Sequence, residues 1–205
     1  MPAAPATDAS PRLVLASASP RRSQLLSAAG ISFETVPANI PEERQPGEPP
    51  REFALRLARE KALAVGMQQP RDDACWVLGA DTIVVLGERI LGKPRDSEEA
   101  ESMLSDLAGR EHEVITAVAL APAGEPRVRD LAVTSRVHFR SATREEVRAY
   151  VATGESLDKA GAYGLQGEGR RFVARVEGSE TNVIGLPMEA TLELLHRVAG
   201  IGGST

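Results

Sequence analysis

The chain has 205 residues, of which 42% are hydrophobic and 26% charged, and its net charge is −5. These values are ordinary for a globular protein, and they fit one α/β domain or two lobes that share a core. The acidic balance provides no overall attraction for nucleic acid or an anionic membrane, so neither is expected as a partner. Any anion binding must therefore come from local clusters of cations.

The N-terminal segment, residues 1–11, is rich in alanine and proline and has neither a basic region nor an apolar core. It does not match a signal peptide, so we expect a disordered tail followed by a single two-lobed domain over residues 12–199. The single cysteine, Cys75, suits a reducing compartment, and no apolar run is long enough to span a membrane. We therefore expect a cytoplasmic protein.

The first expected elements are a buried strand over residues 13–16 and a helix that begins at Pro20 and ends at Gly30. Arg21 and Arg22 fall in the first turn of that helix, where the helix dipole disfavours cations. An anion held there by backbone N–H groups, serine hydroxyls and two guanidinium groups would explain them, which indicates a phosphate site. The alternative is that both arginines are surface residues paired with carboxylates.

A second strand over residues 33–36 leads into a long proline-rich loop, residues 37–50, and then into the clearest helix, residues 51–67. This helix has an apolar stripe, and Lys61 falls on it at the same angular position as Leu57. A lysine on a buried stripe either extends its ammonium group to solvent or meets an anion. The sequence leaves both alternatives open.

A buried strand over residues 76–79 places Asp81 at its carboxyl end, which is where ligands bind in α/β sheets. The chain then continues as a hairpin, residues 82–91, that closes at Gly92-Lys93-Pro94. Lys93 is a candidate phosphate contact, and the alternative is an exposed loop lysine.

The remaining elements alternate between helices and strands. In chain order we expect a helix over residues 96–107, strands over 113–121 and 128–139, a helix over 143–153, strands over 172–176 and 182–184, and a helix over 187–198. A glycine-rich segment, residues 157–169, has neither Rossmann nor Walker spacing. The whole pattern predicts an α/β fold with a mixed sheet and flanking helices.

The chemistry available to the chain is that of oxygen ligands and cations. No histidine or cysteine pattern predicts zinc, and no nucleophile motif predicts covalent catalysis. The candidates are Glu42, Asp81 and Asp158 against Arg21, Arg22, Lys61, Lys93 and Lys159. Cations that cradle phosphates, with carboxylates that hold a hard metal ion such as Mg²⁺, are the components of phosphoryl transfer.

Five segments resemble motifs of the Maf family of nucleoside triphosphate pyrophosphatases, in the order and spacing of that family. They are Ser17-Ala-Ser-Pro-Arg-Arg22, Arg56-Leu-Ala-Arg-Glu-Lys-Ala62, Gly79-Ala-Asp-Thr82, Leu91-Gly-Lys-Pro94 and Leu157-Asp-Lys-Ala-Gly-Ala-Tyr-Gly-Leu-Gln-Gly167. The resemblance extends over residues 13–198. It implies a fold similar to that of the inosine triphosphate pyrophosphatases, an active site in a cleft between two lobes, and usually a homodimer.

The resemblance also implies a reaction, the metal-assisted hydrolysis of a nucleoside triphosphate to the monophosphate and pyrophosphate, which makes the chain a hydrolase of phosphorus anhydrides. Asp81 would activate the water molecule. The phosphates would be held by Ser17, Arg21, Arg22, Lys61 and Lys93, and the residues near the metal would be Glu42 and Asp158. Mg²⁺ is the expected cation, with Mn²⁺ or Co²⁺ as alternatives.

Three positions, Arg21, Thr82 and Gln166, resemble the branch of the family that acts on dTTP and UTP rather than on 7-methyl-GTP. The neutral amide of Gln166 can donate and accept at once, which suits the edge of a pyrimidine. The chain departs from the family at Asn39 and Pro41, where acidic residues are common, and this weakens any metal site in that loop.

The competing hypothesis is a protein without significant turnover, either a nucleotide sensor or a regulator of septum formation in cell division, that uses the same pocket. Such a protein needs the phosphate contacts but has no need of a base. The presence of Asp81 together with the set of lysines favours catalysis.

Overall fold

The computed structural model describes residues 11–202. Its strands are β1 (Arg12–Ala16), β2 (Glu34–Thr35), β3 (Asp72–Leu86), β4 (Arg89–Leu91), β5 (Glu111–Ala123), β6 (Arg129–Phe139) and β7 (Val173–Glu177). Its helices are α1 (Pro20–Ala28), α2 (Pro50–Gly66), α3 (Ser97–Leu107), α4 (Arg144–Val151), α5 (Glu180–Ile184) and α6 (Met188–Ala199), with 3₁₀ turns η1 (Ala160–Ala162) and η2 (Glu168–Phe172). The tail expected over residues 1–11 lies outside the described residues except for its last position. None of the helices described is long and apolar enough to cross a membrane.

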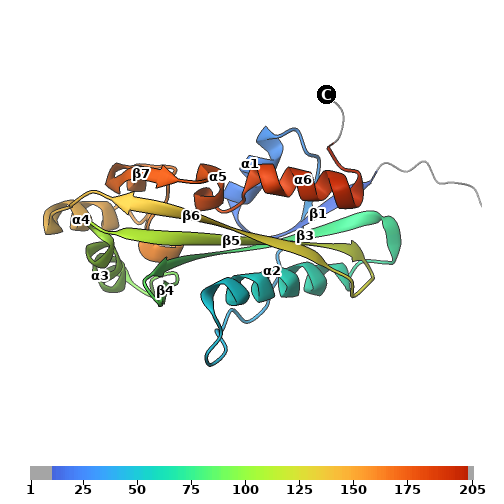
Figure 1. Cartoon of the computed structure of the whole chain (residues 1–205), viewed down its shortest axis with the longest axis horizontal. Coiled ribbons are helices and arrows are strands. Elements are labelled where there is room, and N and C mark those ends of the chain that lie inside the picture. The colour runs from blue at the N-terminus through green and yellow to red at the C-terminus, as the bar shows by residue number, and fades with distance from the viewer. Residues whose placement is uncertain (1–10, 203–205) are drawn as a thin grey trace, which may run out of the picture.

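Within residues 11–202, seven strands form one mixed sheet that has helices on both faces (Figure 1). The strand order is β2-β1-β3-β5-β6-β7, and β4 pairs with β3. β1 runs parallel to β2 and β3, whereas the other pairs are antiparallel. The α2 helix covers one face, and α1, α5 and α6 lie on the other (Figure 1). The predicted α/β fold, with a mixed sheet and flanking helices, is confirmed.

Side chains alternate along β3, so each face of the sheet has its own core. Ile83 packs with Ala58 of α2, whereas Ala80 packs on the opposite face with Leu26 of α1. Gly79 points toward α2, and a Cβ atom there would collide with the backbone carbonyl of Ala58. Only glycine permits this close approach of strand and helix, which brings the middle of α2 against β3.

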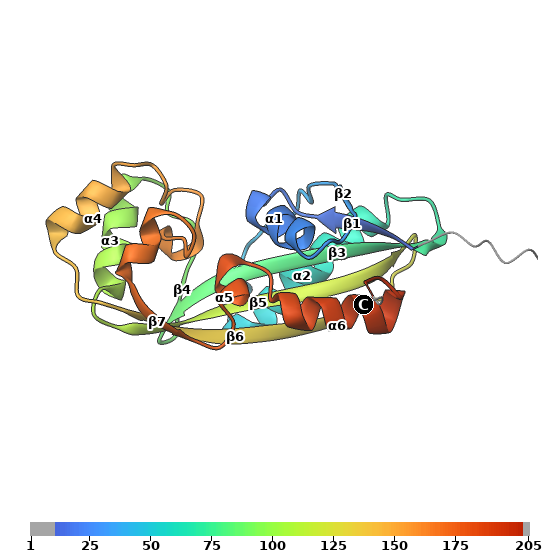
Figure 2. The ribbon, with the colours of Figure 1, turned by 90° about the horizontal axis from the view of Figure 1, so that it is seen from above.

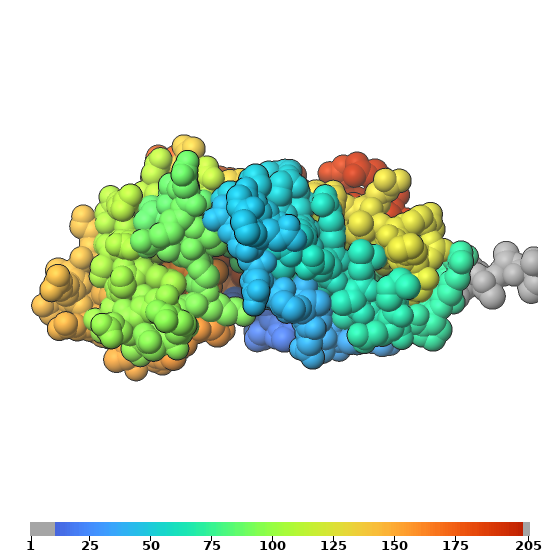
Figure 3. All heavy atoms as spheres, turned by 90° about the horizontal axis from the view of Figure 1, so that it is seen from below, coloured from blue at the N-terminus to red at the C-terminus, as the bar shows by residue number. Residues whose placement is uncertain are grey.

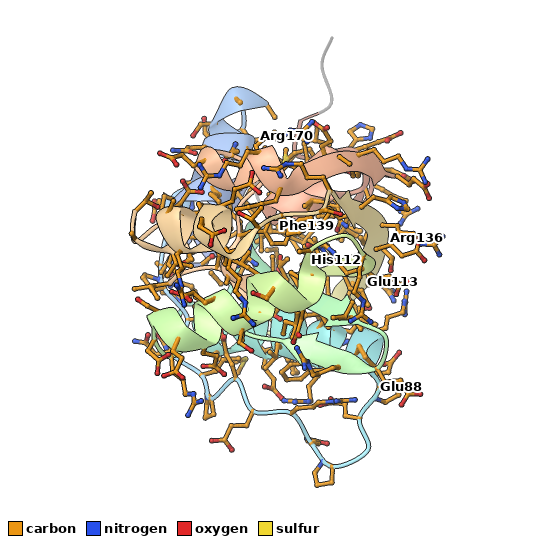
Figure 4. All side chains as sticks on the ribbon, turned by 90° about the vertical axis from the view of Figure 1, so that its left-hand side faces the viewer. Glu88, His112, Glu113, Arg136, Phe139 and Arg170 are labelled. Atoms are coloured by element: carbon orange, nitrogen blue, oxygen red, sulfur yellow. The ribbon has the colours of Figure 1, made fainter. Side chains whose placement is uncertain are left out.

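A second lobe stands at one end of the sheet, where α3, α4 and the 3₁₀ turns gather (Figure 2). Its interior is aromatic: the ring centroids of His112 and Phe139 lie 5.0 Å apart, and Tyr163 contacts both rings. Figure 4 looks onto this end and shows His112 and Phe139 inside, while Glu113 and Arg136 lie toward the outer edge. Successive residues of β5 and β6 thus face opposite sides and close the lobe over an apolar core.

The prediction that Asp81 stands at the carboxyl end of a strand is wrong, because β3 continues through it to Leu86. Antiparallel pairing with β5 extends along this whole stretch, so nothing ends the strand. The neighbour on the other side changes instead: pairing with β1 ends at Gly79, and pairing with β4 begins at Val84. Asp81 therefore lies beside a gap in the sheet, between the end of β1 and the start of β4.

Residues 182–184, expected as a strand, belong to the helix α5, so this prediction is also wrong. The side chain of Ser179 accepts a hydrogen bond from Asn182 N at 3.1 Å and so caps the start of the helix. Val183 and Ile184 pack against the core of the second lobe. A short apolar run of this kind fits a buried helix turn as well as a strand. The other expected elements are present, with ends shifted by a few residues.

Candidate active site

A cavity of about 430 Å³ opens at the gap in the sheet, between the lobe that carries α1 and β1 and the lobe that carries η1. Figure 3 shows the molecule from the α2 side, where it is hollowed between the loop before α2 and the segment around β4. The cavity is lined by every residue that the sequence assigned to the site: Ser17, Arg21, Arg22, Glu42, Lys61, Asp81, Thr82, Lys93, Asp158 and Gln166. The structure brings them together, and the role of each stays a prediction.

On the α2 side of the cavity, a buried lysine lies between two carboxylates. Lys61 is 7% exposed, and its Nζ atom lies 2.6 Å from Asp81 Oδ1 and 2.5 Å from Glu42 Oε1. Of the two alternatives for Lys61, the structure shows the contact with anions, and these anions are carboxylates of the chain itself. Burial alone would raise the pKa of Glu42, but the hydrogen bond and charge of Lys61 outweigh it and hold that pKa below its usual value.

On the opposite side of β3, a buried arginine lies among neutral oxygens. Arg22 donates from Nε to Gly185 O at 2.9 Å and from Nη1 to Ser17 Oγ at 3.0 Å. Its Nη2 donates to Thr82 Oγ1 at 3.1 Å. Burial lowers the pKa of Arg22, although the charge of Asp81 opposes this effect. A guanidinium has five N–H groups, and three are used here, so two remain for a ligand.

At the rim of the cavity, Asp158 is held by two cations. Arg21 Nη1 lies 3.2 Å from Asp158 Oδ2, and Lys159 Nζ lies 2.6 Å from Asp158 Oδ1. Burial would raise the pKa of Asp158, but Lys159 and then Arg21 outweigh it, so this pKa lies below its usual value. The sequence left open whether both arginines pair with carboxylates. The structure separates them, since Arg21 has a carboxylate partner and the hydrogen-bond partners of Arg22 are neutral.

Gln166 and Lys93 line the cavity from exposed positions. The segment that carries Gln166 is anchored by Glu155, whose carboxylate accepts hydrogen bonds from Tyr150 Oη at 3.1 Å and from Gly169 N at 3.2 Å. Glu155 is not among the site residues predicted from the sequence. Its only signal in the sequence is its place two residues before the glycine-rich segment, where backbone N–H groups need an acceptor.

Two further residues belong to the site although the sequence analysis missed them. Gly185 contributes a backbone carbonyl, which no side-chain pattern can predict. Tyr163 lines the cavity, and its hydroxyl lies 2.7 Å from Nε2 of the buried His112. Burial lowers the pKa of His112 to about 4, so the imidazole is neutral at pH 7. This uncharged pair fixes the Tyr163 ring in the wall of the cavity.

The carboxylates of Glu42 and Asp81 fit a hard divalent cation. Both contact the same ammonium nitrogen, so they are close enough to share one cation. Mg²⁺ is usually held by one or two carboxylates together with phosphates of the substrate. Asp158, the other expected neighbour of a metal, is engaged by Arg21 and Lys159. Between residues 11 and 202, no three acidic, histidine or cysteine side chains gather as a metal cluster.

The chain is similar to known proteins over most of its length. A family model described as Maf-like protein matches residues 12–198. A dTTP/UTP pyrophosphatase of Geobacter sulfurreducens is 47% identical over 190 residues, which cover 93% of this chain and 98% of that protein. A dTTP/UTP pyrophosphatase of Escherichia coli O157:H7 is 51% identical over 183 residues, or 89% of this chain and 91% of that protein. Among solved structures, the Staphylococcus aureus Ham1 protein matches 62% of this chain and 71% of its own, with 14% identity and a TM-score of 0.41.

Proposed function

Since the chain belongs to the family of Maf-like proteins, we propose that it hydrolyses nucleoside triphosphates to the monophosphate and pyrophosphate, with dTTP and UTP preferred. Relatives that are 47% and 51% identical carry the name dTTP/UTP pyrophosphatase, which supports this substrate class. The cavity supports it as well, because a buried cation with neutral partners and a carboxylate–lysine pair face the same space.

The observation that carries the proposal is the environment of Arg22. Buried charges in proteins are normally paired, because removing an ion from water costs several kcal/mol. Arg22 keeps its charge among neutral oxygens at a cavity that is open to solvent. An anion in the cavity would complete the pairing, and the triphosphate of a nucleotide is such an anion.

In the proposed reaction, Asp81 accepts a proton from a water molecule whose oxygen attacks the α-phosphorus. The bond from the α-phosphorus to the bridging oxygen breaks, and pyrophosphate leaves with the electron pair. Lys61 contacts Asp81 and fixes the orientation of its carboxylate. Charge on the phosphate oxygens would be met by Ser17, Arg21, Arg22, Lys61 and Lys93. Catalysis then rests on positioning and on fixed charges, as in other phosphoryl transfers.

We expect the reaction to require a divalent cation, with Mg²⁺ first and Mn²⁺ or Co²⁺ as alternatives. Glu42 and Asp81 would hold it together with phosphate oxygens of the substrate. Asp158 would contribute only after release from Arg21 or Lys159. When bound, the cation neutralises phosphate charge and polarises the phosphorus–oxygen bonds.

We propose that Arg21, Thr82 and Gln166 set the choice of base. Gln166 offers a donor and an acceptor together, which matches the imide and carbonyl groups of thymine and uracil. The segment that carries it is anchored in the second lobe by Glu155, whose carboxylate accepts hydrogen bonds from Glu168 N and Gly169 N. A base without the complementary edge leaves polar groups of the site unpaired and should be rejected.

The alternative function, a nucleotide sensor or a regulator of cell division, is not favoured. A sensor would use the phosphate contacts but would have no need of the buried contact between Asp81 and Lys61. The names of the relatives also point to hydrolysis.

We further propose that the chain acts as a homodimer in the cytoplasm. The dimer rests on the family resemblance, and the location rests on the single cysteine, Cys75. Sedimentation of the purified protein tests the dimer, since a single species with the mass of one chain would contradict it.

A substrate panel tests the proposed function, with pyrophosphate and phosphate detected separately. With Mg²⁺, Mn²⁺ or Co²⁺ present, dTTP and UTP should give monophosphate and pyrophosphate at far higher kcat/KM than CTP, ATP or 7-methyl-GTP. Binding of nucleotides without cleavage of any of them would favour the sensor. A preference for purines would contradict the base choice and leave the reaction standing.

A further inference from the structure

Behind Arg22, a line of buried polar groups leads away from the cavity. Thr82 Oγ1, which accepts a hydrogen bond from Arg22, lies 2.9 Å from Thr116 Oγ1. Thr116 Oγ1 in turn donates to the backbone carbonyl of Asn182 at 2.9 Å. Thr116 lies on β5 and Asn182 on α5, and both are fully buried behind the lining of the cavity. These hydrogen bonds therefore connect Arg22 to β5 and α5 through two residues, Thr116 and Asn182, that do not line the cavity.

The direction of these hydrogen bonds follows from the number of protons. Each threonine hydroxyl has a single proton to donate. Because Thr116 gives its proton to Asn182 O, it accepts from Thr82, and the hydroxyl of Thr82 is left as an acceptor for Arg22. Gly185 O also lies 3.4 Å from Thr82 Oγ1, which is too long to compete with the contact at 2.9 Å. Every donor thus points from the guanidinium toward the backbone carbonyl, and each bond polarises the next.

The far end of this hydrogen-bond chain lies in α5, next to the other partner of Arg22. Arg22 Nε donates to Gly185 O, directly after α5, and Thr116 holds α5 at Asn182 O. The side chain of Asn182 ties the helix to β5, since its Nδ2 donates to Val114 O at 2.9 Å. Its Oδ1 is buried and has no hydrogen-bond partner among residues 11–202, so the side-chain amide holds α5 to β5 through its N–H groups alone.

We propose that Thr116 and Asn182 are positioning residues that orient Arg22 for binding phosphate. Nε and both Nη atoms of Arg22 each donate to one acceptor, which fixes the plane of the guanidinium group. The two remaining N–H groups therefore have a fixed orientation. Loss of the Thr116 hydroxyl frees the proton of Thr82, which removes the ordered acceptor for Nη2. The inference rests on the proposed function only in taking phosphate as the ligand of Arg22.

The same proton count assigns a role to Thr82. Its one proton is committed to Thr116 and its oxygen accepts from Arg22, so the hydroxyl has no donor left for a nucleotide base. Thr82 therefore donates no hydrogen bond to the base, and its proposed effect on the choice of base would come through Arg22 or through a hydrogen bond that its oxygen accepts.

Binding of inorganic tripolyphosphate, measured by titration calorimetry, tests the proposal without any turnover. Thr116→Val removes the hydroxyl and keeps the shape, so affinity should fall about tenfold, which equals about 1.4 kcal/mol. Thr116→Ser restores a hydroxyl and should recover most of that loss. Thr191→Val is the matched control, because Thr191 is fully buried on α6 and its Oγ1 has no hydrogen-bond partner in the described part of the chain. Affinity should not change in that variant.

A double-mutant cycle with Arg22→Lys separates positioning from general loosening of the fold. Lysine cannot make the planar contacts of Arg22, so Thr116→Val should change affinity less than twofold in that background. An equal loss in both backgrounds, or no loss in the single variant, overturns the proposal. If Thr116→Val does not fold, Thr82→Val interrupts the same chain one step nearer the arginine and takes its place in the cycle.

Two measurements on the wild-type protein, tripolyphosphate binding and nucleotide cleavage, distinguish a failure of this inference from a failure of the proposed function. If it binds tripolyphosphate but cleaves no nucleotide, the proposed function is wrong, and the cycle still decides whether Arg22 is positioned. If it does not bind tripolyphosphate, both proposals are wrong.

Discussion

The two sides of β3 hold a buried cation in opposite ways. On the α2 side, Lys61 is paired with the carboxylates of Asp81 and Glu42. On the α1 side, the hydrogen bonds of Arg22 within residues 11–202 go to neutral oxygens. Both cations line the same cavity. On the paired side the cation has charged partners without a ligand, whereas on the other side the cation gains a charged partner only when an anion binds.

The chemistry of the two side chains explains which of them stands where. A guanidinium stays protonated, is weakly hydrated and has five donors in a plane, so three neutral oxygens can hold it in low-dielectric surroundings. An ammonium group is strongly hydrated and loses its proton readily when buried without a partner. If Arg22 and Lys61 were exchanged, the lysine would therefore be buried without a charged partner, and the neutral oxygens around it would lose the planar set of donors that Arg22 provides.

The largest effect is expected on the paired side. Asp81→Asn keeps the size of the side chain but cannot accept a proton, so kcat for dTTP should fall about 10²–10⁴-fold. Affinity for tripolyphosphate should stay within a few-fold of wild type, because Arg22 is untouched. Asp73→Asn, an exposed position on the same strand, is the control. A kcat for Asp81→Asn within tenfold of wild type would exclude Asp81 as the base.

The ion pairs on the paired side can be removed with Lys61→Met. The variant leaves two carboxylates against each other, and removing one partner of a buried pair costs about 3–5 kcal/mol. Because Glu42 is half exposed, we expect the lower end, about 3 kcal/mol of unfolding free energy at pH 7. Urea unfolding measures this loss.

The pH dependence of that loss sharpens the test. In wild type the pKa of Glu42 lies below its unfolded value, so its contribution is present at neutral pH and is lost as the pH falls through the folded pKa. Without Lys61, burial and the neighbouring Asp81 disfavour the ionised form and reverse this sign. The deficit of Lys61→Met should therefore shrink between pH 7 and about pH 4.5. An equal deficit at both pH values would contradict the pairing.

The contribution of Gln166 to base recognition should be separable from the contacts of Arg22 and Lys61 with phosphate. Gln166→Glu replaces an amide with a carboxylate that has no donor for the carbonyl groups of a pyrimidine. A pyrimidine carbonyl left without its donor in the bound complex costs about 1–3 kcal/mol, so kcat/KM for dTTP should fall roughly 10–100-fold. Affinity for tripolyphosphate should not change. A matching loss of tripolyphosphate affinity would show that Gln166 acts on the phosphate contacts instead.

The smallest effect is expected from Ser17→Ala on the arginine side. Ser17 Oγ accepts from Arg22 Nη1 at 3.0 Å, so the variant removes one of three neutral acceptors and leaves the charge in place. We expect a loss of about 1 kcal/mol in unfolding free energy and a several-fold rise in the Kd for tripolyphosphate. Calorimetric titration measures the Kd, and the control is Ser23→Ala, because Ser23 lies on α1 but does not line the cavity. Unchanged affinity would mean that two acceptors suffice to hold the guanidinium.

Residue spacing predicts the elements, and the family resemblance predicts which residues line one cavity, better than either predicts contacts. The motif positions in this chain, from Ser17 to Gln166, gather on one cavity. The partner of Lys61 could not be predicted, because helical periodicity places a side chain on a face and says nothing of what a distant loop brings to it. Glu42, from the loop before α2, is that partner together with Asp81.

The two errors in the fold have a common origin, since both depend on long-range contacts. The local residues predict that the strand ends before Asp81, but pairing with β5 keeps β3 extended through that point. The helix turn at Asn182 is fixed by Ser179 and by hydrogen bonds to β5, which no local pattern reveals. The Gly185 carbonyl, which accepts from Arg22, follows directly after α5. Because α5 was expected to be a strand, this neutral partner of Arg22 could not be predicted from the sequence.

Hydrolysis of dTTP in water enriched in oxygen-18 tests the central claim most directly. If water attacks the α-phosphorus on the Asp81 side while the arginine side holds the outgoing phosphates, the products are dTMP and pyrophosphate in equal amounts. One oxygen-18 atom should appear in dTMP and none in pyrophosphate. Label in pyrophosphate, or release of dTDP and phosphate, would contradict the account.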